Sequence, residues 1–254
     1  MRLTTRLAAV LAILVAVGVS TTNAQTITGA QRTEIEKIIR EYLLKNPEVL
    51  QEAIAELEKK NAAAEAEKHQ AAVKDNADTL FNSPRHVVIG NPNGDVAFVE
   101  FFDYNCGYCK RAMADMLALL KDDAKLKVVL KEFPVLGPGS VDAARVAVAV
   151  RMQDKTGKKY LQFHQKLLGV RGQADKARAL AVAKEVGLDM ARLERDLTSD
   201  EVRASLEESF KLAEKLGLNG TPSYVIGNKV VIGAVGLDAL KEKINNARCG
   251  QATC

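Results

Sequence analysis

Three different hydrophobic patterns follow one another along this 254-residue chain. Residues 7–19 form one uninterrupted apolar run. Residues 35–57 carry apolar side chains three and four positions apart, a spacing that is typical of amphipathic helices. Beyond residue 84, short apolar runs of the kind found in β-strands alternate with further helical patterns. The chain is therefore predicted to contain a leader, a helical segment and a mixed α/β domain.

The first 24 residues have the layout of a secretory signal peptide. A short basic start precedes the apolar run, and the small polar cleavage triplet Thr22-Asn23-Ala24 ends the segment. The run is shorter than the roughly 20 apolar residues that a membrane-spanning helix needs. We therefore predict that residues 1–24 are removed and that the mature protein is exported in soluble form, without insertion into a membrane.

Residues 25–80 are predicted to form a helical segment ahead of the main domain. Its apolar positions are Ile35, Ile38, Ile39, Tyr42, Leu43, Leu50, Ile54 and Leu57. Residues 58–76 are rich in Ala, Glu and Lys, which favour a helix but supply almost no apolar surface. The apolar stripe packs either on the main domain or against the same stripe of other copies of the chain. The polar linker favours self-association, because it holds the stripe away from the domain. We interpret residues 25–80 as an N-terminal helical oligomerisation stalk and linker.

Residues 81–254 are predicted to form an α/β domain. In order, we predict strands at 86–89, 96–102, 127–133, 223–226 and 229–232, with helices at 111–120 and 237–247. The first helix connects two strands in a βαβ arrangement, which implies a parallel pair. Gly227-Asn228 is a hairpin turn between the last two strands. A helical block at about 138–217 interrupts the sheet, so the prediction is a sheet domain with a helical insertion.

Composition and charge argue against nucleic acid and anionic membranes as partners. The chain carries 36 Lys and Arg against 32 Asp and Glu, a net charge of +4, and two of the basic residues lie in the leader. So small an excess indicates neither partner. Aromatic residues make up 5% of the chain and Trp is absent, which argues against a stacking surface for single strands.

The chain has four cysteines, Cys106, Cys109, Cys249 and Cys254. In an exported protein an even number favours disulfides over zinc. Four cysteines permit three pairings, and the spacing favours the two local pairs. Cys249 and Cys254 follow the closing helix and are predicted to form a small structural disulfide, with a second, exposed redox pair as the alternative.

The first pair stands in the sequence Cys106-Gly107-Tyr108-Cys109, where a predicted strand ends and a helix begins. Unpaired amides and the helix dipole at a helix N-terminus stabilise a thiolate and lower its pKa. Cys109 lies one helical turn further on, close enough to form a disulfide with Cys106 or to resolve a mixed disulfide. A zinc half-site and a structural disulfide are the alternatives, but the second pair does not have zinc-ligand spacing. We predict redox chemistry with Cys106 as nucleophile and Cys109 as resolving thiol.

Three features together resemble the DsbA-like disulfide oxidoreductases of the thioredoxin superfamily. They are Glu-Phe-Phe-x-x-x-Cys-x-x-Cys after a strand, the helical insertion, and Gly220-Thr221-Pro222-Ser223-Tyr224 before the final hairpin. The similarity covers roughly residues 84–247. It implies a thioredoxin fold with an inserted helical domain. No cofactor is expected, because the Cys pair carries the electrons. The similarity also implies that Pro222 is a cis proline facing the cysteines, and that Thr221 contacts substrate through its backbone.

Glu100 stands in an apolar strand six residues before the first cysteine. The DsbA-like family places a buried acid at this position. Burial raises the pKa of a carboxyl group, so Glu100 is a candidate acceptor for the proton of the resolving thiol. Lys131, in the next strand, is its candidate charge partner, and a purely structural ion pair is the alternative. Asp103 and Tyr104 are expected to shape the loop before the cysteines.

The dipeptide Gly107-Tyr108 lacks the His that strong oxidases of this family carry between their cysteines. One group that stabilises the thiolate is then missing, so the reduced form is less favoured. The dipeptide and the Thr before Pro222 resemble the DsbC-type isomerases. Gly107, Tyr108, Thr221 and Pro222 are therefore the predicted substrate-binding residues. The stalk resembles that of the ScsC-like (suppressor of copper sensitivity) proteins, which implies a homo-oligomer, with a trimer favoured, and isomerase activity.

The sequence therefore predicts a periplasmic thiol–disulfide oxidoreductase, a disulfide isomerase or reductase acting on unfolded or misfolded exported proteins. A membrane reductase of the DsbD or ScsB type is the expected redox partner. The alternative within the enzyme class is a net dithiol oxidase of the DsbA type, recharged by a DsbB-type protein. The alternative from another class is a copper-tolerance protein that holds Cu(I) between Cys106 and Cys109. No Met/His cluster accompanies the pair, so this role ranks second and no resident metal is expected.

Overall fold

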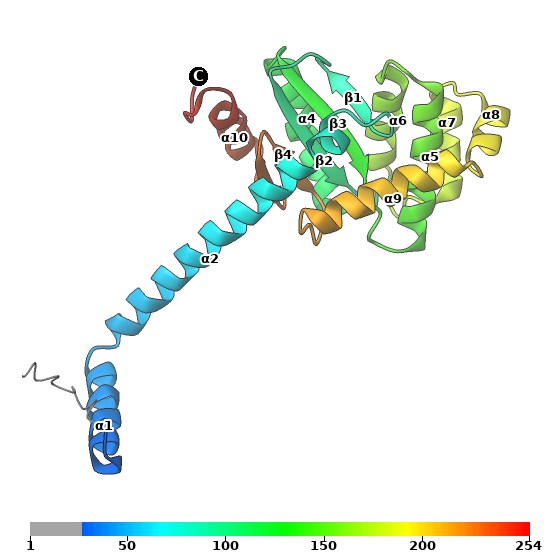
Figure 1. The fold of residues 1–254 in the computed structure, drawn as a ribbon. Coiled ribbons are helices and arrows are strands. Elements are labelled where there is room, and N and C mark those ends of the chain that lie inside the picture. The colour runs from blue at the N-terminus through cyan, green and yellow to red at the C-terminus, as the bar shows by residue number, and fades with distance from the viewer. Residues whose placement is uncertain (1–26) are drawn as a thin grey trace, which may run out of the picture. The chain divides into compact units, whose positions relative to one another are not determined.

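The computed structural model describes residues 27–254 (Figure 1). The predicted signal peptide, residues 1–24, lies outside the described residues. After Glu58 the chain passes from a helical N-terminal unit into a larger unit that contains the sheet. Within the described part of the chain, no helix is both long and apolar enough to cross a membrane.

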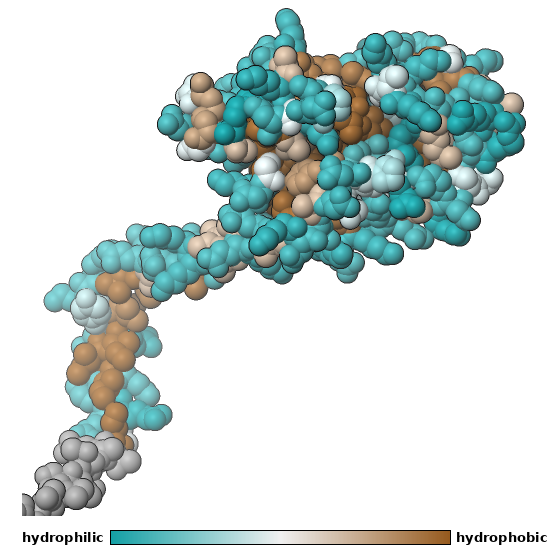
Figure 2. Space-filling model, turned by 45° about the horizontal axis from the view of Figure 1, so that its top comes forward, coloured by the Kyte–Doolittle hydropathy of each residue, from teal (hydrophilic) through white to brown (hydrophobic). Residues whose placement is uncertain are grey.

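The N-terminal unit consists of α1 (Gly29–Lys45) and the first turns of α2 (Glu48–Asp75). α1 begins with a capping box, in which Thr28 and Gln31 each satisfy a backbone amide of the other. No residue of α1 is buried. The exposed large apolar side chains of this unit are Ile27, Ile35, Ile38, Ile39, Tyr42, Leu44, Leu50, Ile54 and Leu57. Figure 2 shows apolar surface gathered along this unit, so the other described residues of the unit leave the predicted stripe exposed.

The larger unit is built on one five-stranded sheet in the order β1-β3-β2-β4-β5. Its strands are β1 (Val87–Gly90), β2 (Val96–Phe102), β3 (Leu126–Glu132), β4 (Ser223–Ile226) and β5 (Lys229–Ile232). β2 and β3 are parallel, and every other neighbouring pair is antiparallel. The central parallel pair follows from the βαβ arrangement, because a crossover helix returns the chain in the same direction.

The remaining helices cover the sheet and form the insertion. They are α3 (Ala77–Phe81), α4 (Gly107–Asp122), α5 (Pro138–Gln153), α6 (Lys158–Leu168), α7 (Lys176–Glu185), α8 (Met190–Asp196), α9 (Asp200–Lys215) and α10 (Leu237–Cys249). α4 and α10 pack on one face of the sheet, and α3, α9 and the end of α2 pack on the other. Figure 1 shows α5–α8 grouped at one side of the sheet. The thioredoxin fold with a helical insertion between β3 and β4 is therefore confirmed.

β2 determines where the site lies, because its side chains are buried on both faces of the sheet. Phe98 and Phe102 face the core under α4, whereas Val99 and Phe101 face the core under α9. Such continuous burial is typical of a central parallel strand. Glu100 is the single charged residue of the strand, and only 3% of it is exposed.

The final hairpin depends on Gly227. This residue has φ +58°, and a Cβ at this position would lie 2.9 Å from the Cβ of Ala247 in α10. A glycine therefore lets α10 pack closely on the turn between β4 and β5. On the other face, Val73 and Leu80 are buried in the core, so this core includes residues before position 81.

Candidate active site

Cys106 and Cys109 lie where the sheet meets α4. Cys106 is the N-cap residue of α4, and Cys109 lies in its first turn. The backbone amide of Cys109 donates to Cys106 Sγ at 3.3 Å, and the Cys106 thiol donates to the carbonyl oxygen of Thr221 at 3.1 Å. Both cysteines are free thiols, and Cys109 is fully buried. The Cys106 sulfur therefore lies between a helix N-terminus and the loop before β4.

These contacts separate the pKa values of the two thiols. A hydrogen bond from the Cys109 side chain has the largest effect on the pKa of Cys106. Together with the Thr221 side chain and two backbone amides, it lowers this pKa to about 5, although burial acts in the opposite direction. The same hydrogen bond to Cys106, together with burial, raises the pKa of Cys109. Near neutral pH Cys106 is therefore a thiolate, the nucleophilic form, while Cys109 keeps its proton.

The loop before β4 is brought to the cysteines by strand pairing. Ser223, the first residue of β4, pairs with Phe101 near the end of β2. The Thr221–Pro222 peptide bond is cis, as the resemblance implies. The Ser223 hydroxyl donates to the carbonyl of Gly220 at 2.7 Å and closes the loop. Cys106 and Thr221 therefore meet although 115 positions separate them in the sequence.

Glu100 lies on the same face of the sheet as α4 and its cysteines. Burial is the main reason why its pKa is raised to about 8, and the negative charges of Cys106 and Asp115 add to the effect. In turn, Glu100 contributes to the raised pKa of Cys109, which shows that the two groups interact. A carboxyl group with this pKa exchanges protons readily near neutral pH, as a general acid or base requires.

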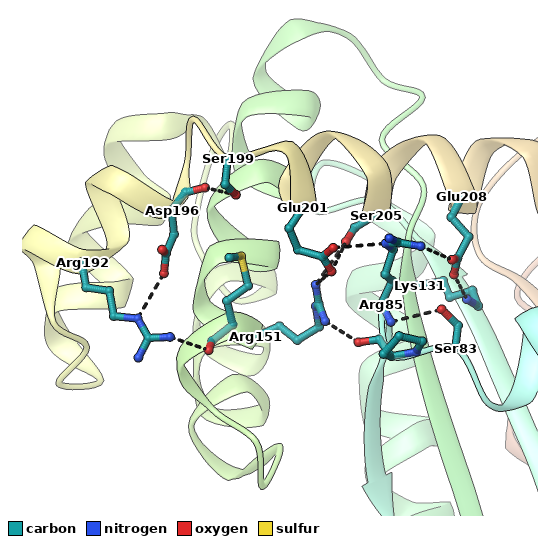
Figure 3. Close-up of polar contacts among 12 residues, drawn as sticks. Ser83, Arg85, Lys131, Arg151, Arg192, Asp196, Ser199, Glu201, Ser205 and Glu208 are labelled. Carbon is teal, nitrogen blue, oxygen red and sulfur yellow. Dashed lines mark hydrogen bonds and ion pairs between the residues drawn. The ribbon is translucent and has the colours of Figure 1, made fainter.

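Lys131 is not the charge partner of Glu100, so that prediction is wrong. In the parallel register Glu100 lies opposite Leu130, and Lys131 lies opposite Phe101. Successive residues of a strand point to opposite faces, which places Lys131 on the face away from α4. There its Nζ pairs with Oε1 of Glu208 in α9 at 3.3 Å (Figure 3). Lys131 therefore links the sheet to the helical insertion and takes no part in the cysteine site.

We expect the two halves of the Lys131–Glu208 pair to respond differently to substitution. Glu208→Gln leaves a buried ammonium without its carboxylate and is expected to cost about 3 kcal/mol of unfolding free energy. Lys131→Met leaves Glu208 with its second partner Arg85, 3.5 Å away, and is expected to cost less than about 1 kcal/mol. Urea unfolding of each variant measures its change in unfolding free energy. A change in the Cys106 pKa in either variant would contradict this separation of Lys131 from the site.

Asp103 and Asn105 hold the loop before the cysteines. Asp103 Oδ1 accepts hydrogen bonds from the Asn105 amide and the Ser140 hydroxyl, both at 2.7 Å. Its Oδ2 accepts from the amides of Val135 and Leu136, both at 2.9 Å. Asp103 therefore ties the loop to the segment after β3 and to α5, in line with its expected role.

Asn105 is a positioning residue that sequence reasoning missed. Its side-chain amide donates to the carbonyl of Ala174 at 2.9 Å, and its oxygen accepts from the Ala174 amide at 2.7 Å. Asn before a Cys-x-x-Cys motif signals a turn, but nothing in the sequence indicates a partner 69 positions away. This pair of bonds attaches the helical insertion directly to the residue before Cys106.

The surface around Cys106 is partly apolar. Tyr108 is 59% exposed, and the guanidinium of Arg111 lies 4.4 Å from its ring centre. Gly107 is the first residue of α4, and a Cβ there would meet no atom within 4 Å. Val135 and Leu136, held by Asp103, are also exposed. The exposed Tyr108 ring therefore belongs to the first turn of α4, next to Cys109, and the Thr221 carbonyl lies against the Cys106 sulfur.

A second buried polar cluster lies between the sheet and α6. The Tyr160 hydroxyl donates to Glu132 at 2.5 Å, and the hydroxyls of Tyr160 and Tyr104 lie 3.4 Å apart. Nδ1 of His164 lies 3.2 Å from the Tyr104 hydroxyl, and burial lowers the pKa of this His to about 3. Within residues 27–254, no group of three or more His, Cys, Asp or Glu residues is placed to hold a metal ion.

Cys249 and Cys254 are joined by a disulfide after the last helix. Cys249 is the final residue of α10, and Gly250 continues the chain in the left-handed conformation with φ +77°. The two Cα atoms lie 6.3 Å apart. The bridge closes a short exposed tail, remote in sequence from Cys106.

A thiolate at a helix N-terminus, facing a proline loop in a thioredoxin fold, defines the class of thioredoxin-like thiol–disulfide oxidoreductases. Comparison with known families agrees. Residues 97–245 match the DSBA-like thioredoxin domain, and the chain belongs to this family. Residues 31–64 match the copper resistance protein ScsC N-terminal domain, so the predicted resemblance of the stalk is confirmed.

Several solved structures are similar to this chain. A thioredoxin-like oxidoreductase from Silicibacter pomeroyi DSS-3 is 47% identical, with a TM-score of 0.64 over 67% of this chain and 96% of that one. Proteus mirabilis ScsC in a transitional conformation is 29% identical, with a TM-score of 0.64 over 89% of this chain and 98% of that one. The thiol-disulfide exchange protein α-DsbA2 from Wolbachia pipientis is 30% identical, with a TM-score of 0.65 over 70% of this chain and 95% of that one.

Curated relatives include two kinds of protein. Na(+)/H(+) antiporter NhaA 1 of Salinispora arenicola is 26% identical over 65% of this chain, and the chain spans only 25% of that protein's length. Disulfide bond formation protein D of Bacillus subtilis is 26% identical over 65% of this chain and 78% of its own length. The second match extends over most of a dedicated disulfide-handling protein.

Proposed function

We propose that this protein is a periplasmic disulfide isomerase and reductase of exported proteins. The observation that carries the proposal is the position of Cys106, whose sulfur lies at a helix N-terminus against the Thr221 carbonyl and has a pKa of about 5. Such a thiol is ionised and nucleophilic near neutral pH. Export into an oxidising compartment rests on the leader sequence 1–24.

The reaction begins when the Cys106 thiolate attacks one sulfur of a substrate disulfide. A bond forms between Cys106 and that sulfur, the substrate disulfide breaks, and the other substrate sulfur leaves as a thiolate. If a different substrate thiolate then attacks the mixed disulfide, Cys106 is released and the substrate is isomerised. If Cys109 attacks, its proton goes to Glu100, the substrate leaves reduced, and Cys106 and Cys109 become a disulfide.

We assign substrate binding to Gly107, Tyr108, Thr221 and Pro222. The backbone at Thr221 holds an extended substrate segment next to Cys106, and the exposed ring of Tyr108 offers it apolar surface. Unfolded or misfolded chains expose extended, apolar segments of this kind, whereas folded proteins do not. The substrates are therefore misfolded exported proteins rather than one folded partner.

Isomerase and reductase activity require that the cysteines are kept reduced. The Gly107-Tyr108 dipeptide supplies no His to stabilise the thiolate further, so the reduced pair gives its electrons more readily to substrate disulfides and must then be reduced again by a partner. A membrane reductase of the DsbD or ScsB type is the partner that would deliver the two electrons. The alternative is net oxidation, with a DsbB-type partner that removes them. The disulfide between Cys249 and Cys254 is assigned a structural role in the tail.

We propose that residues 25–80 assemble the protein into a homo-oligomer, with a trimer favoured. The uncovered apolar stripe of α1 and the first turns of α2 supports this, because exposed apolar surface of that extent is normally covered by a partner. Assembly would place several Cys106 sites within reach of one misfolded substrate and raise their effective concentration.

Alkylation at different pH values tests the proposed nucleophile. In the reduced protein we expect iodoacetamide to modify Cys106 with a rate that falls to half at about pH 5 and is nearly constant above about pH 7. Cys109 is expected to stay unmodified, because it is fully buried and its pKa is raised. Mass spectrometry of peptides identifies the modified residue. Equal rates for the two thiols at pH 6 would refute the assignment.

A copper role is the second candidate, and the match of residues 31–64 to a copper resistance protein domain is the observation that favours it. Cu(I) would be held by the soft sulfurs of Cys106 and Cys109. Titration of the reduced protein with Cu(I) tests this directly. If disulfide exchange without copper is as fast as with it, and alkylation of Cys106 removes both activities, copper binding is secondary to exchange.

A further inference from the structure

Tyr224 faces Glu100 from the neighbouring strand. In the antiparallel register of β2 and β4, Glu100 and Tyr224 are direct partners. Directly opposite residues on one face have Cβ atoms about 4.5–5.5 Å apart. Tyr224 also belongs to the same core cluster as Cys106 and Cys109, on the face that α4 covers. The phenol, the carboxyl group and the resolving thiol therefore share one buried region.

The hydroxyl of Tyr224 has no hydrogen-bond partner, although solvent does not reach it. Among the described residues it is the only hydroxyl in this condition. The other large buried tyrosines differ, because Tyr104 and Tyr160 hydrogen-bond within the polar cluster beside α6. An unpaired buried hydroxyl is unfavourable and rare in native proteins, so it calls for an explanation.

Glu100 also makes no hydrogen bond to the described residues. Its raised pKa keeps the carboxyl group largely protonated, and therefore neutral, near pH 7. To take the proton of Cys109 it must first be ionised. A carboxylate in an apolar interior is unfavourable unless a donor supports it. The pKa of Tyr224 is raised, mainly by burial and then by Glu100, so the phenol keeps its proton and remains a donor.

Apart from Cys109, whose proton is the one transferred, the described groups named around Glu100 supply no other N–H or O–H donor. α4 contributes the sulfurs of Cys106 and Cys109 and the carboxylate of Asp115, all of which are neutral or negative. α10 contributes the apolar side chains of Leu240 and Ile244 to this core. β3 places Leu130 opposite Glu100. The Tyr224 hydroxyl is therefore the donor that the ionised form of Glu100 needs.

We propose that Tyr224 is a positioning residue for thiol–disulfide exchange, whose hydroxyl donates a hydrogen bond to the Glu100 carboxylate while that carboxylate takes the proton of Cys109. The contact forms directly through a small side-chain rotation or through one water molecule. The proton moves from Cys109 to Glu100, and Tyr224 keeps its own. This inference rests on the proposed role of Glu100 in the resolving step.

The resolving step is measured with full-length reduced protein and oxidised glutathione. Cys106 first releases one glutathione and holds the other as a mixed disulfide. Cys109 then attacks this mixed disulfide and releases the second glutathione. Stopped-flow detection follows the rate of this second release between about pH 5 and pH 9. The pH at which the rate of resolution is half-maximal is the midpoint, and it reports the pKa of Glu100. For native protein we expect it below 8, because Cys106 has lost its negative charge in the mixed disulfide and no longer raises that pKa. Tyr224→Phe is expected to raise this midpoint by about one pH unit and to slow resolution at pH 7 about tenfold.

Two further variants separate this role from a structural one. In a Glu100→Gln protein, adding Tyr224→Phe is expected to change the rate of resolution no further, because the carboxylate that takes the proton of Cys109 is gone. Tyr160→Phe removes a different buried hydroxyl and is expected to lower stability while leaving the midpoint unchanged. An unchanged midpoint in Tyr224→Phe, or an equal slowing in the Glu100→Gln background, overturns the inference. If native protein itself forms no mixed disulfide with glutathione, the proposed function fails instead.

Discussion

Replacing Cys106 by serine is expected to abolish disulfide exchange, whereas replacing Cys109 by serine is expected to trap substrates as mixed disulfides. A serine hydroxyl is not ionised near neutral pH, so Cys106→Ser loses the nucleophile and on the order of 1000-fold or more of the exchange rate. Cys109→Ser keeps the nucleophile and loses only the group that resolves the intermediate. Exchange with a disulfide-bonded peptide measures the first effect, and mass spectrometry of the non-reduced protein detects the trapped adduct.

The tail cysteines supply the matched control. A Cys249→Ser, Cys254→Ser double variant removes the two sulfurs that lie after α10 rather than at α4, and it is expected to exchange disulfides at the native rate. Substantial exchange by Cys106→Ser would show that another sulfur is the nucleophile. A Cys109→Ser protein that accumulates no adduct, with its exchange rate unchanged, would show that Cys109 does not resolve intermediates.

Introducing charge into the apolar stripe of α1 is expected to separate the oligomer into monomers. Ile38→Asp and Tyr42→Asp together place two carboxylates where we expect the copies to pack, and burying them there is strongly unfavourable. Light scattering is expected to fall from the mass of an oligomer, a trimer in our proposal, to that of one chain. Isomerisation of a scrambled protein is expected to slow about tenfold, because several linked sites no longer act on one substrate.

Two comparisons make the stalk experiment specific. Glu41→Gln changes an exposed polar residue of the same helix and is expected to leave both mass and activity unchanged. A shortened chain should begin at Lys59, because a later start near Leu80 removes Val73 from the core under the sheet. If native protein and the double variant both run as monomers, the stalk does not assemble the chain and a monomeric oxidase is favoured.

The sequence predicts the features that depend on local pattern. The βαβ order, the helical insertion and the Gly227-Asn228 hairpin follow from alternating and helical spacings together with turn chemistry. The placement of Cys106 at a helix N-terminus follows from the strand before it and the helix after it. The cis bond at Pro222 was expected only through resemblance to a family, since an isolated Thr-Pro predicts no more than a turn.

Features that depend on strand register and distant packing were not predictable. Lys131 is the predicted partner of Glu100 because it stands in the next strand, but a shift of one residue in register reverses the face on which a side chain lies. Asn105 finds Ala174 only because the insertion folds back on the loop. Tyr224 looks like an ordinary core aromatic until β4 is placed beside β2 with Glu100 as its partner.

The redox equilibrium of the Cys106–Cys109 pair with glutathione tests the central claim most directly. The Cys106 pKa of about 5 lies between the values of about 3.5 for DsbA and about 7 for thioredoxin. We therefore expect one reversible disulfide, with a potential between about −120 mV, as in DsbA, and about −270 mV, as in thioredoxin, close to the value of about −180 mV for protein disulfide isomerase. A potential at or above about −120 mV would instead identify a net oxidase, and failure of the pair to form a disulfide would contradict the account altogether.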